Sequence, residues 1–73
     1  MSFASEIKKI RVDCMLSQQA FAKELGVTQL TITRWETGKN IPSYSAMQRL
    51  LAYCEIKKLN SNGLKDSWKE QNE

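Results

Sequence analysis

Histidine is absent from this chain of 73 residues, and cysteine is scarce. With only Cys14 and Cys54, far apart in the sequence, neither a metal-binding cluster nor a Cys/His nucleophile can be assembled. The sequence also lacks a glycine-rich phosphate loop and paired carboxylates. We therefore expect no enzyme activity, no metal and no cofactor. Both cysteines are interpreted as small apolar packing residues, although the sequence leaves a disulfide between them open.

Long apolar runs are missing as well. No segment approaches the roughly 20 apolar residues that cross a bilayer, and no apolar signal core occurs in the N-terminal segment MSFASEIKK. We therefore expect no membrane association and a cytoplasmic protein. The net charge of +3 and the pI near 9.0 permit a nucleic-acid partner without requiring one, because small domains often carry such a balance on a solvated surface. The length predicts a single domain, residues 1–73, with a small core.

What the sequence does contain is helical periodicity. An apolar stripe predicts a first helix between about residues 2 and 14, formed by Phe3, Ile7, Ile10 and Cys14. Ser2 can cap this helix. A second stripe predicts a helix after the cap Ser43, formed by Met47, Leu50, Leu51 and Cys54. The end of this helix is ambiguous within residues 55–59. Leu64 and Trp68 mark a C-terminal helix over about residues 62–70, followed by a frayed tail, residues 71–73.

Between these helices, residues 17–42 read SQQAFAKELGVTQLTITRWETGKNIP. The first part predicts a short helix that Ser17 caps and Gly26 ends, with an apolar inner face formed by Phe21, Ala22 and Leu25. The second part predicts another short helix that Thr28 caps, with Ile32 and Trp35 on its inner face. The second helix keeps a separate outer face, formed by Gln29, Leu30, Thr33 and Arg34. We predict a helix-turn-helix over about residues 17–36, inside a compact all-α bundle of about five short helices.

This segment resembles the helix-turn-helix of phage Cro and repressor proteins and of bacterial regulators of the xenobiotic-response-element type. The resemblance is carried by Gln18, Ala22, Gly26, Val27, Ile32 and Trp35, and by the run WETGK followed by Ile41, Pro42 and Ser43. It implies a lambda-repressor-like DNA-binding domain from a bacterial or phage-infected cell. Met15 departs from the pattern, because the family commonly has a glycine there. A side chain disfavours a left-handed cap, so we expect the first helix to close by another route or to run longer.

The outer face of the second helix, residues 28–36, has side chains that suit the major groove. Gln29 can pair with adenine and Arg34 with guanine, while Leu30 and the Thr33 methyl group can pack on thymine methyls. The resemblance implies these same four base-reading positions. It also implies DNA phosphate contacts from Gln18, Thr37, Lys39 and Asn40. The alternative is that the outer face is merely a polar, exposed stripe.

Arg11 borders the buried stripe of the first helix, where a charge needs a partner. Glu36 lies four residues after Ile32, on the inner side of its helix, and can supply one. The resemblance implies that the two residues form a structural ion pair between these helices. The alternative is a pair of exposed charges that contributes under about 1 kcal/mol.

The resemblance implies a sequence-specific transcriptional regulator that binds double-stranded DNA. We expect a repressor that acts as a homodimer on a pseudo-palindromic operator. With no room for a second domain, dimerisation is expected on DNA or through the C-terminal helix region, with Leu59, Leu64 and Trp68 as candidate interface residues. Trp68 is equally well interpreted as a core residue. Activation through polymerase remains open, and the alternative function is an antitoxin or adaptor that binds a protein partner such as a toxin.

Overall fold

The computed structural model describes residues 2–71, and this range contains five helices and no strand. The helices are α1 (Phe3–Asp13), α2 (Gln18–Leu25), α3 (Gln29–Glu36), α4 (Tyr44–Ile56) and α5 (Asn62–Gln71). The prediction of an all-α bundle of about five short helices is confirmed. Of the predicted frayed tail, Gln71 is helical, and residues 72–73 lie outside the described residues. Within the described range, no helix combines the length and the apolar character needed to cross a membrane.

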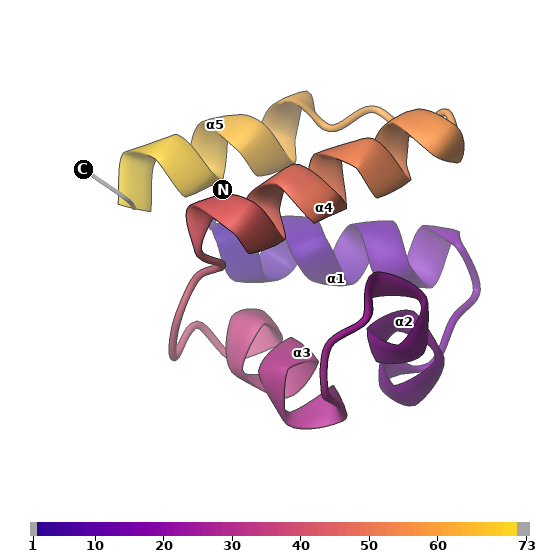
Figure 1. Ribbon diagram of the computed structural model, residues 1–73. Helices are drawn as coiled ribbons and strands as arrows, with labels where there is room; N and C mark the ends of the chain where they lie inside the picture. The colour runs from indigo at the N-terminus through magenta and orange to yellow at the C-terminus, as the bar shows by residue number, and fades with distance from the viewer. Residues whose placement is uncertain (1, 72–73) are drawn as a thin grey trace.

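Helix α1 lies at the centre of the arrangement (Figure 1). It packs against both α3 and α5, while α2 packs mainly against α3. In Figure 1, α4 and α5 lie above α1, and α2 and α3 lie below it. The bundle measures 30 × 25 × 21 Å along its principal axes. The helix-turn-helix therefore occupies one side of the molecule, and α5 occupies the opposite side.

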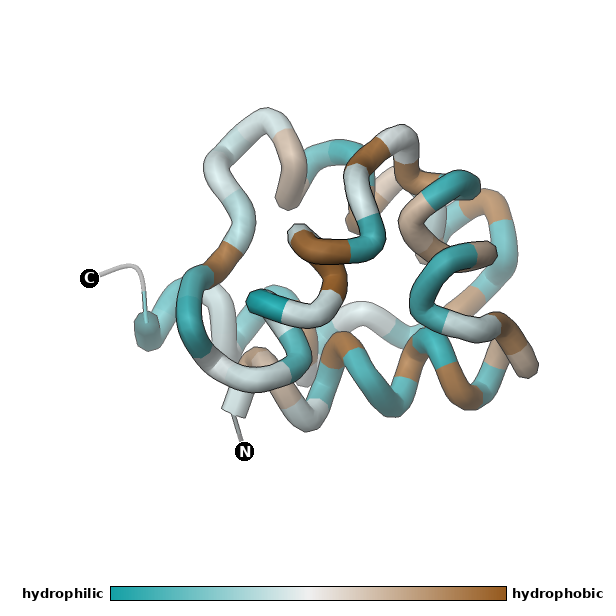
Figure 2. The backbone as a smooth tube through the Cα atoms, turned by 90° about the horizontal axis from the view of Figure 1, so that it is seen from below, coloured by the Kyte–Doolittle hydropathy of each residue, from teal (hydrophilic) through white to brown (hydrophobic). Residues whose placement is uncertain are grey.

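Each helix contributes part of one hydrophobic core. Apolar residues spaced three or four apart place one face of every helix inward, and Figure 2 shows the resulting alternation of hydrophobic and hydrophilic positions along the chain. Cys14, which continues the stripe of α1 in the sequence, is only half-buried because the helix ends before it. The buried core consists of Phe3, Ile7, Ile10, Phe21, Ala22, Leu25, Ile32, Trp35, Met47, Leu50, Cys54, Leu64 and Trp68.

Hydroxyl side chains cap the N-termini of four helices, as the sequence predicts. Each cap accepts a hydrogen bond from the backbone N–H three residues further on, at 3.1 to 3.3 Å. This bond satisfies one of the N–H groups that a helix leaves without an internal partner. The four caps are Ser2, Ser17, Thr28 and Ser43.

Gly63 lies inside the first turn of α5. A Cβ atom at this position would collide with the carboxylate of Glu6, which projects from α1. The missing side chain therefore leaves room for the Glu6 carboxylate, the flexible end of a side chain that would otherwise have to move. Asn60 precedes the helix and accepts a hydrogen bond from the Asn62 N–H through its side-chain oxygen, at 3.0 Å.

The C-terminal ends of α1 to α4 share one hydrogen-bonding pattern. In α1, the Met15 N–H donates to the Val12 carbonyl at 2.9 Å and the Leu16 N–H donates to the Arg11 carbonyl at 3.2 Å. This pair of bonds is a Schellman motif, which requires a residue with positive φ. The expectation that Met15 avoids this conformation is wrong, because its φ is 58° and the two bonds compensate for the strain. The positive-φ residues are Met15, Gly26, Gly38 and Lys58.

We predict that Met15→Gly stabilises the domain. The Met15 side chain is 91% exposed, so its removal costs little packing. Glycine removes the Cβ clash of the left-handed conformation but increases the entropy of the unfolded chain, and we expect a net gain of roughly 0.5 to 1 kcal/mol. Urea unfolding measures the gain. The control Met15→Ala keeps the Cβ atom and should unfold as the parent does; equal stabilisation by both variants would contradict the explanation.

Candidate nucleic-acid interface

The turn between α2 and α3 holds the two helices in a fixed relation. Gly26 adopts a φ of 73°, and the Val27 N–H donates to the Ala22 carbonyl at 3.0 Å. Ala22 is 3% exposed, and its small side chain lets the two helices lie close together. Thr28 follows Val27 directly and caps α3, which begins at the next residue. The sequence prediction of a short turn followed immediately by a second capped helix agrees with this geometry.

An ion pair joins the end of α1 to the end of α3. The Arg11 Nε atom lies 2.6 Å from Glu36 Oε2, and Arg11 Nη2 donates to Glu36 Oε1 at 3.1 Å. The two side chains are 13% and 4% exposed, so the pair is not the exposed alternative. The hydrogen bond with Glu36 raises the pKa of Arg11 above its ordinary value, against the opposing effect of burial. Arg11 Nη1 also donates to the Leu16 carbonyl at 2.8 Å, so the loop before α2 is tied to the same guanidinium.

The outer face of α3 carries the predicted base-reading residues on one side. Gln29 and Arg34 are exposed, and Leu30 is 57% exposed. Thr33 is half-buried at the border with α2. On the opposite face, Ile32 is fully buried and Trp35 is 4% exposed. The helix therefore separates a packed inner face from a polar outer face, as its sequence pattern predicts.

Gln18, the first residue of α2, bonds to two residues in the C-terminal half of α3. Its Nε2 atom donates to Glu36 Oε1 at 3.2 Å, and its Oε1 atom accepts the Thr33 hydroxyl proton at 3.0 Å. The Thr33 hydroxyl also lies 3.1 Å from the Gln29 carbonyl. The sequence predicts only a phosphate contact for Gln18, so these bonds are an addition from the structure. The spacing of Gln29 and Thr33 indicates the bond within α3, but no sequence signal reveals the bonds between helices.

The residues after α3 continue the same surface. Lys39 and Asn40 are exposed, and the Lys39 N–H donates to the Arg34 carbonyl at 2.9 Å. Thr37 is exposed too, but its hydroxyl donates to the Thr33 carbonyl at 2.8 Å. The loop therefore starts from a fixed end of α3 and presents one cation and one amide to solvent.

The predicted dimer surface needs a correction. Leu64 is 1% exposed and Trp68 is 8% exposed, so both belong to the core of the single chain and leave little surface for an interface. The indole N–H of Trp68 donates to the Pro42 carbonyl at 2.8 Å, which fixes the segment between α3 and α4. Among the three predicted residues, Leu59 alone is partly exposed. Of the two interpretations of Trp68, the core residue is the one that the structure supports.

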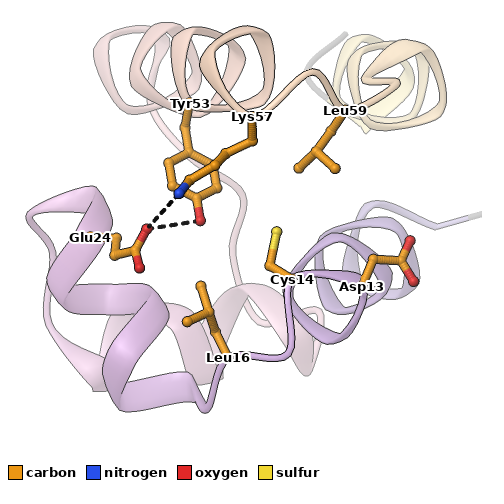
Figure 3. Close-up of a pocket in the computed structure, with 7 residues that line it drawn as sticks. All are labelled: Asp13, Cys14, Leu16, Glu24, Tyr53, Lys57 and Leu59. Carbon is orange, nitrogen blue, oxygen red and sulfur yellow. Dashed lines mark hydrogen bonds and ion pairs between the residues drawn. The ribbon is translucent and has the colours of Figure 1, made fainter.

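A pocket of about 300 Å³ lies beside the helix-turn-helix, between the end of α1, α2 and the end of α4 (Figure 3). The Tyr53 hydroxyl donates to Glu24 at 3.0 Å. The pKa of Tyr53 is raised, mainly because the hydroxyl is partly buried and also because of this hydrogen bond. Cys14 lines the pocket and forms no disulfide with the buried Cys54. Burial is also the main cause of a raised pKa of the Cys54 thiol, so this thiol stays protonated at neutral pH. No residue of α3 lines this pocket.

The comparison with known families agrees with this arrangement. Residues 7–59 match the helix-turn-helix family HTH_3, of the Cro/C1 type. The chain belongs to this family. The matched region runs from α1 to the residues after α4, so it contains the ion pair and the outer face of α3 but not α5. No curated protein and no solved structure matches the chain significantly. The family assignment makes the chain a DNA-binding transcription regulator.

We predict that removal of one member of the ion pair destabilises the domain strongly. Arg11→Met leaves the Glu36 carboxylate without its main partner in a buried position, and we expect a loss of about 3 to 5 kcal/mol. Glu36→Ala should cost a similar amount. Chemical denaturation measures both, with Lys8→Met on the exposed face of α1 as a control that changes stability by less than about 0.5 kcal/mol. Unfolding of Arg11→Met at the parent's midpoint would show that the pair contributes nothing.

Proposed function

We propose that this regulator is a repressor that inserts α3 into the major groove of a specific DNA sequence. The observation that carries the proposal is the exposed row formed by Gln29, Leu30 and Arg34 on a helix whose opposite face is buried. Gln29 can form two hydrogen bonds to adenine, and Arg34 can form two to guanine. Leu30 and the methyl group of Thr33 can contact thymine methyls. We propose these four residues as the base readers.

Phosphate contacts would orient α3 in the groove. Gln18 is the first residue of α2, where free backbone N–H groups and the helix dipole favour an anion. Its side-chain amide donates one hydrogen to Glu36 and keeps a second for a phosphate oxygen. Lys39 and Asn40 present donors just beyond α3. Thr37 would have to turn its hydroxyl from the Thr33 carbonyl to contact a phosphate.

A homodimer on a pseudo-palindromic site extends this proposal. A domain whose longest dimension is 30 Å suits one half-site, and two copies of α3 about 34 Å apart would enter successive major grooves on one face of DNA. Because Leu64 and Trp68 are buried, we propose that the dimer forms largely on DNA. A weak interface between free subunits is consistent with the small exposed part of Leu59.

Two observations favour the alternative function as an antitoxin or adaptor. Two large apolar side chains of α4 are exposed, Tyr44 at 71% and Ile56 at 77%. An apolar hollow of about 280 Å³ also lies between α4 and α5, lined in part by Tyr44 and Leu51. These features suit contact with a protein, and they lie on helices other than α3. The choice between the two functions therefore depends on whether α3 recognises a DNA sequence.

Selection of binding sites from a random duplex library, at near-physiological salt, tests the proposed function. We expect an enriched palindrome, and we expect Gln29→Ala and Arg34→Ala each to lose about 1 to 3 kcal/mol of specific affinity for it. Lys69→Ala on α5 serves as the control, because α5 lies across the bundle from α3 (Figure 1). Absence of any enriched sequence, with binding that only weakens as salt rises, would refute sequence-specific recognition and favour the protein-partner alternative.

A second prediction concerns salt. If Lys39 contacts a phosphate, Lys39→Ala should weaken binding to all sequences by a similar factor. It should also reduce the slope of log affinity against log salt by about one for each subunit. Titrations at several salt concentrations measure this slope, again with Lys69→Ala as the control. An unchanged slope in Lys39→Ala would place this lysine away from the DNA backbone.

A further inference from the structure

The Glu36 carboxylate determines the orientation of the Gln18 side chain. A carboxylate only accepts hydrogen bonds, so the group of Gln18 that faces Glu36 must be its NH₂ group. The carbonyl oxygen of the same amide must then face Thr33. Because that oxygen only accepts, the Thr33 hydroxyl must be the donor in its hydrogen bond with Gln18. A buried charge in the core thus fixes the direction of a hydrogen bond at the edge of the outer face of α3.

This direction changes what Thr33 can offer to DNA. Its hydroxyl has a single proton, and two acceptors of the protein lie within reach: Gln18 Oε1 at 3.0 Å and the Gln29 carbonyl at 3.1 Å. No proton remains for a base. The hydroxyl oxygen, held between Gln18 and Gln29, could then meet a base only as an acceptor. The methyl group takes part in neither bond, and a methyl group can pack on the 5-methyl group of thymine.

We propose that Glu36 and Gln18 are positioning residues for recognition: they hold the Thr33 hydroxyl against α2, so that Thr33 reads thymine by its methyl group. This inference rests on the proposed insertion of α3 into the major groove. In this role Glu36 acts through Gln18, and Gln18 acts through Thr33. The ion pair that stabilises the bundle thereby also selects which group of Thr33 faces the DNA.

The first test uses the free protein without DNA. Three-bond NMR couplings report the side-chain rotamer of Thr33, and we expect one rotamer in the parent. Gln18→Leu removes the acceptor and should give an averaged mixture, whereas Gln19→Leu, which changes an exposed neighbour on α2, should keep the single rotamer. A single Thr33 rotamer in Gln18→Leu would overturn the proposal, because the Gln29 carbonyl alone would then hold the hydroxyl.

The second test uses the DNA enriched by selection, with each thymine of the half-site replaced in turn by deoxyuridine, which lacks the methyl group. We expect one position at which the parent loses about fourfold in affinity per half-site, the effect of one buried methyl group. Thr33→Val should keep this loss, Thr33→Ser should abolish it, and Gln18→Leu should reduce it. Each ratio compares two DNAs on one protein, so a lost phosphate contact of Gln18 cancels.

Equal loss in Thr33→Ser and Thr33→Val would overturn the proposal. Failure to enrich any DNA would instead refute the proposed function, and the rotamer test would then decide the role of Gln18.

Discussion

The ion pair between Arg11 and Glu36 is the interaction on which the rest of the structure depends. Both charges are largely removed from water, and each would destabilise the fold by several kcal/mol if left unpaired. Their pairing is possible only when the end of α1 meets the end of α3. The same guanidinium holds the Leu16 carbonyl, and the same carboxylate holds Gln18 at the start of α2. One pair of charges therefore sets the relative positions of three helices.

This constraint is needed because the helices are short. α2 and α3 have eight residues each, which is too few for a stable isolated helix in water. Their stability comes from packing, with Ile32 and Trp35 holding α3 against the core. Since the inner face carries the packing and the pairing, the exposed residues Gln29, Leu30 and Arg34 of the outer face can change with little effect on the fold. A fixed helix with a variable surface is what a reader of different DNA sequences requires.

Much of this arrangement could be predicted from the sequence, because caps and apolar stripes are local signals. Thr28, Ile32 and Trp35 together indicate where α3 begins and which face is buried. Met15 could not be predicted, since its left-handed conformation is imposed by two backbone bonds that only the folded loop supplies. The burial of Trp68 depends on contacts between distant segments, and so do the bonds of Gln18 to Thr33 and Glu36. Contacts between residues far apart in the chain produce no periodic pattern in the sequence from which they could be predicted.

Methylation interference on the enriched DNA tests the central claim most directly. Dimethyl sulfate modifies guanine at N7, in the major groove, and adenine at N3, in the minor groove. The account predicts that methylation of one guanine in each half-site blocks binding of the parent and no longer matters for Arg34→Ala. Interference only at adenine N3 would contradict it, because α3 would then not lie in the major groove.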